Sequence, residues 1–224
     1  MSATPIVRLA DVSKSFESAN ETTPVLSGVD LMIGPGQKTS LVGPSGSGKS
    51  TLMSLIAGLL RPTTGTVEID GIDMRGLDDN ARARLRAKRI GIALQSDNLI
   101  PFLSAAENVQ LAMAFVPGGS SRASKARAES LLDQFGVASR ARNRPRQLSG
   151  GEAQRVALAV AMANDPALLL ADEVVGQLDS TTAGQVVDEV MAADFAVLFV
   201  THDLALADRA EHRYAIENGT VCLR

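Results

Sequence analysis

Residues 43–51 read GPSGSGKST, and this stretch decides the fold. A glycine, four further residues and then Gly48-Lys49-Ser50 give the spacing of a phosphate-binding loop. Glycines let the backbone adopt positive φ and bring consecutive N–H groups close to phosphate oxygens, and the helix that follows adds its positive N-terminal end. An apolar, strand-like run precedes the loop and a helical pattern follows it, so a flexible Gly/Ser linker is a poor explanation.

The loop supplies the first set of candidate binding residues. Lys49 is expected to reach the β- and γ-phosphates of a nucleotide, and the Ser50 hydroxyl is expected to bind Mg²⁺. The predicted nucleotide-binding residues of the loop are Gly43, Pro44, Ser45, Gly46, Ser47, Gly48, Lys49, Ser50 and Thr51.

Four apolar runs of the chain each lead into polar groups. Residues 39–42 enter the phosphate-binding loop, and the runs 89–95, 167–173 and 196–202 end at Gln95, at Asp172 and Glu173, and at His202. Apolar runs that alternate with helical patterns predict parallel strands joined by crossover helices. Ligands of open parallel sheets bind beyond the carboxyl ends of the strands, so we expect all four ends to face one site.

The polar residues at these ends have distinct expected roles. Asp172 suits a magnesium site, where it would hold the waters that Mg²⁺ retains, and Glu173 could take the proton of an attacking water. Gln95 would contact Mg²⁺ or that water, and His202 would sense the γ-phosphate. Taken alone, the acidic pair could also be a helix cap, and the glutamine and the histidine could be ordinary polar residues. The predicted catalytic residues are Lys49, Glu173 and His202, and the predicted metal ligands are Ser50, Gln95 and Asp172.

The ends of the chain and its middle have different patterns. Short strands are expected at 6–12, 66–71 and 213–223, as edge pieces of an antiparallel layer, and Asn218-Gly219 predicts a hairpin in the last of them. Between Gln95 and Asp165 the pattern is helical, which predicts a helical insertion on an α/β core.

A second glycine-rich helix start, LSGGE, occupies residues 148–152. Ser149, Gly150 and Gly151 again offer backbone N–H groups, a hydroxyl and a positive helix end, which together can hold a phosphate. One compact chain has little use for two such loops on the same γ-phosphate. The economical solution is reciprocal: each chain holds its nucleotide with residues 43–50 and covers that of a second chain with residues 148–152, Glu152 included. This exchange predicts a two-fold dimer.

Composition limits the other functions. The 224 residues fit one domain, and the single cysteine, Cys222, excludes an intramolecular disulfide and favours a reducing compartment. A net charge of −3 argues against a general nucleic-acid binder. We find no signal-peptide pattern, and the longest apolar runs fall short of the roughly 20 residues that cross a bilayer. Two basic runs, 82–89 and 140–146, are either solvated surface or contacts for a partner or acidic lipid headgroups.

Taken in order, the motifs resemble one family. The ordered set is GPSGSGKST, Gln95, LSGGE, LLLADE at 168–173, Leu178-Asp179 and His202. This set resembles the ATP-binding subunit of an ABC transporter over essentially the whole chain, and LSGGE in this context is highly specific. The segment GLLRPTTGTVEIDG at 58–71 further resembles the branch of lipoprotein-releasing, macrolide-exporting and cell-division ATPases.

The resemblance implies a single ABC ATPase domain with an α/β fold. Its parts would be a P-loop NTPase (RecA-like) core at 1–95 and 165–224, an antiparallel β layer, and a helical subdomain at 96–164 that carries the LSGGE motif. The implied cofactors are ATP and Mg²⁺. The resemblance assigns Phe16 to adenine stacking, although a lone phenylalanine after a strand is more often core packing. Leu178-Asp179 would lie at the dimer contact, and residues 95–109 would receive a coupling helix of the membrane subunit, unless their apolar side chains are domain core.

The implied activity is Mg²⁺-dependent ATP hydrolysis that closes a dimer and powers a separate polytopic membrane permease. The substrate would be a lipoprotein or a lipophilic, drug-like molecule that is exported or extracted. The chain would be a homodimer at the cytoplasmic face of the inner membrane, peripheral and held there only by the permease, without nucleic acid. One alternative uses the same cycle to transmit force to an extracytoplasmic partner. Others are a soluble assembly or nucleic-acid-associated ABC ATPase, and a P-loop kinase or GTPase, which would leave LSGGE unexplained.

The sequence also departs from the family pattern. After Glu173 the usual Pro-Thr is replaced by Val174-Val175, Gln177 stands where Asn is common, and Val160 stands where Arg is frequent. None of these changes removes an expected phosphate or Mg²⁺ ligand, so the prediction of an active ATPase stands. They bear instead on the rate and on the communication between the two sites.

Overall fold

The computed structural model describes residues 4–18, 21–93, 99–118, 120–172, 187–201 and 204–224. The chain forms two compact units. The first consists of residues 1–83 and 194–224, and the second of residues 84–193. The second unit is wider than the helical stretch expected at 96–164, because it also contains two strands that flank the helices in the sequence. The division expected from the family stays a prediction.

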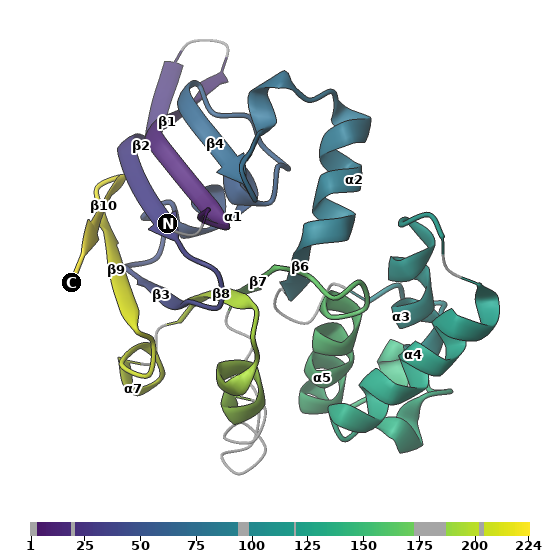
Figure 1. Ribbon diagram of the computed structural model, residues 1–224. Helices are drawn as coiled ribbons and strands as arrows, with labels where there is room; N and C mark the ends of the chain where they lie inside the picture. The colour runs from purple at the N-terminus through teal and green to yellow at the C-terminus, as the bar shows by residue number, and fades with distance from the viewer. Residues whose placement is uncertain (1–3, 19–20, 94–98, 119, 173–186, 202–203) are drawn as a thin grey trace. The chain divides into compact units, whose positions relative to one another are not determined.

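The first unit contains a four-stranded antiparallel sheet in the order β2-β1-β4-β5 (Figure 1). The strands are β1 Val7–Ser18, β2 Glu21–Ile33, β4 Thr64–Ile69 and β5 Ile72–Asp73. Alternating residues of β1, among them Val7 and Leu9, are buried, as expected for a sheet with one face on the core. The expected strands at 6–12 and 66–71 are confirmed. β2 was not predicted, because its first four residues are polar or proline and exposed.

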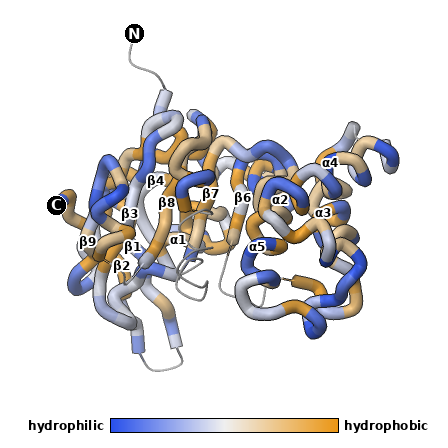
Figure 2. The backbone as a smooth tube through the Cα atoms, turned by 90° about the horizontal axis from the view of Figure 1, so that it is seen from below, coloured by the Kyte–Doolittle hydropathy of each residue, from blue (hydrophilic) through white to orange (hydrophobic). Residues whose placement is uncertain are grey.

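A second sheet of the first unit holds the phosphate-binding loop. Its strands lie in the order β10-β9-β3-β8, with β3 at Lys38–Val42, β8 at Ala196–Val200, β9 at His212–Glu217 and β10 at Thr220–Leu223. β3 pairs in parallel with both β8 and β9. Every residue of β8 is buried, and the strand is hydrophobic along its length in Figure 2. Fully buried, unalternating strands are typical of parallel sheets.

The C-terminal hairpin is correct as a hairpin and wrong in its place. β9 and β10 are antiparallel, and Asn218 and Gly219 turn between them with φ of 49° and 77°, as a two-residue hairpin requires. The sequence pattern predicts this hairpin in the antiparallel layer. It belongs to the mixed sheet instead, because the buried Ala215 and Ile216 let β9 lie along β3.

Short helices complete the first unit. α1, Lys49–Ile56, follows the phosphate-binding loop and buries Leu52, Met53, Leu55 and Ile56. A 3₁₀ turn at Met74–Gly76 precedes α2, Asp79–Arg89, whose second half belongs to the second unit. The basic run at 82–89 is therefore part of a helix. α7 spans Leu204–Ala207.

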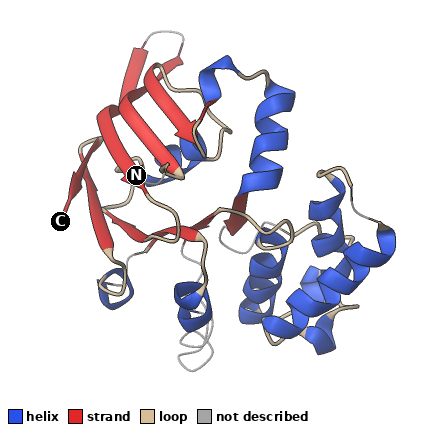
Figure 3. Cartoon of the chain, in the orientation of Figure 1, coloured by secondary structure: helices blue, strands red, loops and turns tan. Residues whose placement is uncertain are grey.

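The second unit joins two parallel strands to a group of helices (Figure 3). The strands are β6 Ile90–Ala93 and β7 Leu168–Asp172, and the helices are α3 Ala105–Ala114, α4 Ser121–Gln134 and α5 Gly150–Ala161, with 3₁₀ turns at Ala138–Arg140 and Pro145–Gln147. α5 packs closely on β6, because a Cβ at Gly91 would lie only 2.4 Å from the Ala161 carbonyl oxygen. The helical pattern expected between Gln95 and Asp165 is confirmed by these helices. None of the helices in the described ranges combines the length and the hydropathy needed to span a bilayer.

Candidate functional site: a phosphate-binding loop and a second glycine-rich helix start

The phosphate-binding loop connects β3 to α1 and needs glycine at two points. Gly48 is the N-cap of α1 with φ of 105°, a backbone conformation that side chains disfavour. Gly43 passes so close to β9 that a Cβ there would lie 2.5 Å from the Ile216 carbonyl oxygen. The loop is thus fixed against the sheet at its start and turned into the helix at its end.

Lys49 holds its ammonium group inside the loop. The residue is 9% exposed, and Nζ donates hydrogen bonds to the carbonyl oxygens of Gly43 and Pro44 at 2.8 and 2.7 Å. These bonds place a positive charge within the curve of the backbone. The arrangement fits a phosphate, which would meet a charge and hydrogen-bond donors in one place.

The start of α1 supplies further donors. The first backbone bond of the helix runs from Leu52 N to Gly48 O at 2.8 Å, so the N–H groups of residues 49–51 precede the helical ladder. The Ser47 hydroxyl is buried and has no hydrogen-bond partner among the described residues. An unpaired buried hydroxyl costs free energy, and a phosphate oxygen would satisfy it. The loop therefore fits the nucleotide that the sequence predicts.

A groove of about 590 Å³ runs beside the loop. Its walls are Thr23–Ser27 of β2, residues 44–47 of the loop, and Asn218 and Gly219 of the β9–β10 turn. The turn is held against β2, since Ser27 N donates to Gly219 O at 2.9 Å. No local sequence signal predicts this turn beside the loop, because the approach depends on how the two sheets meet.

Phe16, expected at the adenine, lies on β1 next to this groove. Its partner across the ladder is Thr23, which lines the groove. The ring is 42% exposed, so it is not core packing, and the Lys14 ammonium lies 5.0 Å from its centroid. An exposed ring beside the groove supports adenine stacking, which stays a prediction.

The LSGGE motif forms the N-terminus of α5 in the second unit. Ser149 is the N-cap, and its hydroxyl accepts a hydrogen bond from Glu152 N at 3.3 Å. Glu152 Oε2 accepts from Ser149 N at 2.8 Å, which completes a capping box. The exposed Ser149 and Gly150 leave this helix start open to solvent.

Glu152 is held by hydrogen bonds at both carboxylate oxygens. Besides the bond from Ser149 N, Oε1 accepts from Arg140 Nε at 2.8 Å. The backbone N–H of Ser149, followed by the Arg140 side chain, lowers the pKa of this carboxyl below its usual value. Since both oxygens are engaged, Glu152 orients the helix start, and phosphate contact would come from Ser149, Gly150 and Gly151.

The remaining predicted site residues do not all fall within the described chain. Asp172 ends β7 and is half-buried; it belongs to the second unit and the loop to the first, so their meeting at one site stays a prediction. The predictions for Gln95, Glu173, His202, Leu178-Asp179, Val174-Val175 and Gln177 concern positions outside the described residues.

The region expected to receive a coupling helix has mixed burial. Leu99 is 7% exposed and packs in the core, whereas Phe102 is 68% exposed. Core packing therefore holds for Leu99, and receipt of a coupling helix stays a prediction for the exposed part of the segment. Asn108, which carries no sequence signal of its own, fixes the segment: its Oδ1 accepts from Ile100 N at 2.7 Å and its Nδ2 donates to Ser104 O at 2.9 Å.

Comparison with known proteins decides the family. The pattern of the ABC transporter family matches residues 26–176, which include both glycine-rich helix starts. The chain belongs to the ABC transporter family. Among its relatives, the lipoprotein-releasing system ATP-binding protein LolD of Anaeromyxobacter dehalogenans is 44% identical over 98% of this chain and 93% of that protein. The macrolide export ATP-binding/permease protein MacB of Syntrophobacter fumaroxidans is 39% identical over 96% of this chain and 31% of that protein.

The fold of this ABC protein matches solved ABC cassettes. The ATP-binding cassette MJ0796, solved as a dimer in a post-hydrolysis state bound to ADP and Pi, superimposes with a TM-score of 0.90. The two are 38% identical, and the match covers 96% of each chain. The P-loop NTPase fold and the assignment as an ABC-type ATPase, an ATP-binding subunit, are thereby confirmed.

Proposed function

We propose that this ABC ATPase works as a homodimer at the cytoplasmic face of the membrane, where Mg²⁺-dependent ATP hydrolysis powers a separate permease. ATP binding follows from membership of the ABC family. The dimer, the metal ion, the permease and the location are proposed.

One observation carries the dimer. A second helix start suited to phosphate lies exposed at Ser149 and Gly150, in a different compact unit from the phosphate-binding loop. An exposed serine N-cap followed by glycines can donate to phosphate oxygens brought by another molecule. Reciprocal exchange between two copies gives each helix start a ligand and makes the interface two-fold. The solved dimer of the MJ0796 cassette supports this arrangement.

The residues present suit ATP and Mg²⁺. Lys49 and the N–H groups of residues 49–51 would bind the phosphates, while the Ser50 hydroxyl and Asp172 would hold Mg²⁺. When bound, Mg²⁺ neutralises phosphate oxygens and orients them for attack. Glu173 would take the proton of the attacking water, with Gln95 and His202 beside it.

The transported molecule is proposed from the relatives. The LolD proteins are named for a lipoprotein-releasing system, and MacB for macrolide export. We propose a lipoprotein or another lipophilic molecule as the substrate, handled entirely by the permease. Force transmission without transport is the alternative, and it requires the same permease-like partner.

The dimer is tested with Glu173→Gln, which should stop hydrolysis and leave ATP bound. Analytical ultracentrifugation should show monomers without nucleotide and dimers with Mg-ATP. The double variant Glu173→Gln/Ser149→Asp is the matched control, because aspartate keeps the N-cap and places a negative charge beside the phosphate. It should remain monomeric with an unchanged melting temperature. A monomeric Glu173→Gln protein at saturating Mg-ATP, or a double variant that dimerises equally well, would contradict the proposal.

The permease is tested by isolating the protein from its own cells. Purification of a tagged chain from detergent-solubilised membranes should yield a polytopic membrane protein in stoichiometric amount. Recovery of the chain alone from the soluble fraction, or with an assembly complex or nucleic acid, would reject the transporter assignment while leaving the ATPase assignment intact.

A further inference from the structure

A second cleft of the first unit, distinct from the groove beside the phosphate-binding loop, lies at the other end of α1. It measures about 290 Å³. Leu55 and Gly58, at the end of α1, are among its lining residues, whereas the loop lies at the start of that helix. Eight helical residues separate the two ends by about 12 Å, and the cleft and the groove share no lining residue.

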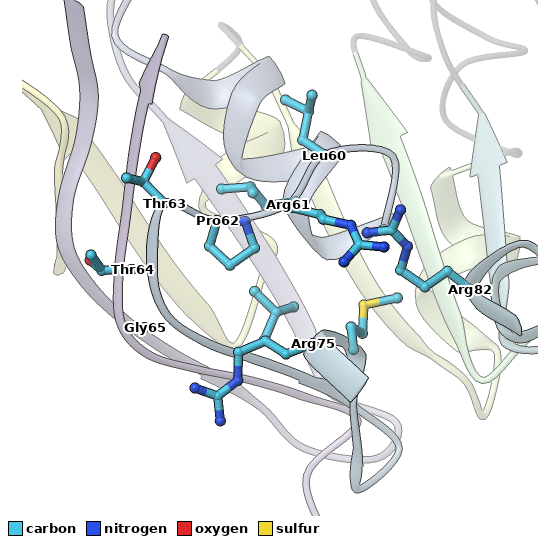
Figure 4. A pocket seen from close by; sticks show the side chains of 12 residues that line it. Leu60, Arg61, Pro62, Thr63, Thr64, Gly65, Arg75 and Arg82 are labelled. Carbon is cyan, nitrogen blue, oxygen red and sulfur yellow. The ribbon is translucent and has the colours of Figure 1, made fainter. Parts of the chain in front are cut away.

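Two arginines meet in this cleft. The guanidinium groups of Arg61 and Arg82 face one another (Figure 4). One oxygen, Oδ1 of Asp79, accepts from Nη2 of Arg61 at 3.1 Å and from Nη2 of Arg82 at 2.6 Å. One carboxylate therefore serves two cations. The third arginine of the cleft, Arg75, has its own carboxylate in Asp73, at 2.8 Å from Nη2.

Arg82 is the unusual member of the pair. It is only 8% exposed, while the side chain of its counter-ion Asp79 is 84% exposed. The Arg82 Nε–H group is buried and has no hydrogen-bond partner among the described residues. A buried guanidinium with an unused donor costs free energy, because the charge loses its hydration and the N–H group makes no hydrogen bond. An oxyanion in the cleft would balance the charge and accept the hydrogen bond.

The rest of the lining is mixed, because Thr63, Thr64 and Arg75 stand beside apolar residues. Leu55, Val67 and Met74 are buried, and Pro62 is half-buried and offers an accessible apolar surface. An inorganic ion would make no use of that surface. A molecule with an anionic end and a small hydrocarbon or ring part would use both kinds of wall, which is the usual composition of a small-molecule site.

We propose that this cleft, the Arg61–Arg82 pocket, binds a small organic molecule that carries a phosphate or carboxylate group. The anion lies between the two guanidinium groups and accepts from Arg82 Nε, and the apolar part packs on the half-buried Pro62. Arginine suits both anions, since its planar donors match their oxygens.

The test uses the full ¹⁵N-labelled chain saturated with Mg-ADP, so that the phosphate-binding loop is filled. Phenyl phosphate is titrated and the arginine Nε–H signals are followed by NMR. The Arg82 signal should shift saturably with phenyl phosphate, and it should also shift saturably with benzoate. Arg61→Gln, at a side chain that is 56% exposed, should weaken phenyl phosphate binding at least ten-fold. Arg84→Gln, at an exposed position of α2, the helix that carries Arg82, should leave the affinity for phenyl phosphate unchanged.

Three outcomes would overturn the proposal. The first is the absence of a saturable Arg82 shift at millimolar phenyl phosphate. The second is equal affinity in the wild type and the folded Arg61→Gln variant. The third is binding of inorganic phosphate, or of the neutral benzyl alcohol, as tight as that of phenyl phosphate, because the site would then recognise only one half of the proposed ligand.

Discussion

At the scale of single residues, the phosphate-binding loop depends on the absence of a side chain at Gly43 and on the positive charge of Lys49. Gly43 allows contact with β9, because even a methyl group would meet the Ile216 carbonyl oxygen at 2.5 Å. Lys49 fills the curve of the loop with a charge, held by the carbonyl oxygens of Gly43 and Pro44. Shape and charge are therefore separate requirements, and each can be removed alone.

Replacing Lys49 with Met removes the charge and keeps most of the side-chain volume. A charge-assisted hydrogen bond contributes about 1.5–3 kcal/mol, so ATP should bind at least ten-fold more weakly. Isothermal titration with ATP measures the change, and steady-state hydrolysis should fall with it. Lys125→Met, on the exposed side of α4, is the control and should bind ATP normally. Unchanged affinity in Lys49→Met would remove this lysine from the phosphate site.

Replacing Gly43 with Ala tests the shape of the loop. The new methyl group must displace either β9 or the loop, and overpacking of this kind costs about 1–3 kcal/mol. Urea denaturation should show the loss in the free energy of unfolding. Gly76→Ala is the matched control, because a Cβ there meets no atom within 4 Å. If both variants are equally stable, the close approach between loop and β9 is not a constraint.

At the scale of elements, α3 and α5 begin with the same device. Ser104 and Glu107 form a capping box on α3, as Ser149 and Glu152 do on α5. In both helices the backbone N–H of the serine, as the largest influence, lowers the pKa of the glutamate. The LSGGE motif thus combines an ordinary helix start with glycines that expose it.

The lowered pKa of Glu152 predicts a pH effect. Its folded pKa lies below the unfolded value of about 4.3, so its contribution to stability is present above that value and is lost as pH falls through the folded pKa. Glu152→Gln should therefore be less stable than wild type at pH 6, and the difference should shrink below about pH 4. Urea denaturation at each pH measures it. Glu129→Gln, at an exposed position of α4, is the control and should be as stable as wild type at pH 6; a similar loss of stability there would mean that the effect is not specific to the cap.

Elements with a local signal were predictable from the sequence, and long-range placements were not. The loop at 43–51, the helix start at 148–152 and the Asn218-Gly219 turn follow from residue types that dictate backbone shape over a few positions. The sheet that β9 joins, and the unit to which β6 and β7 belong, depend on pairings between distant segments. The burial of Arg82 was likewise not predictable from the sequence. The basic run at 82–89 resembles a solvated helix face, and only the packing of the folded chain buries Arg82.

At the scale of the whole molecule, nucleotide binding and dimer formation should protect different units. Mg-ADP on the wild-type monomer should slow amide exchange in β3, α1 and the 218–219 turn, because the turn and the loop that joins β3 to α1 line the groove in the first unit. Mg-ATP on Glu173→Gln should extend the protection to residues 148–152 of the second unit, where the partner's phosphate is expected. Protection of 148–152 in a monomer would argue against reciprocal exchange. Exchange in the middle of α4 should not respond to either nucleotide.

The pairing of β3 with β8 and β9 has a consequence for synthesis. The strand that leads into the phosphate-binding loop is made early, yet both of its neighbours, residues 196–200 and 212–217, are translated more than 150 residues later. Until those segments leave the ribosome, residues 38–42 have no partner on either edge, and a strand with unpaired edges is prone to misassociation. A nascent chain truncated before residue 196 should therefore be a client of chaperones and unable to retain ATP, although it already carries every residue of the loop.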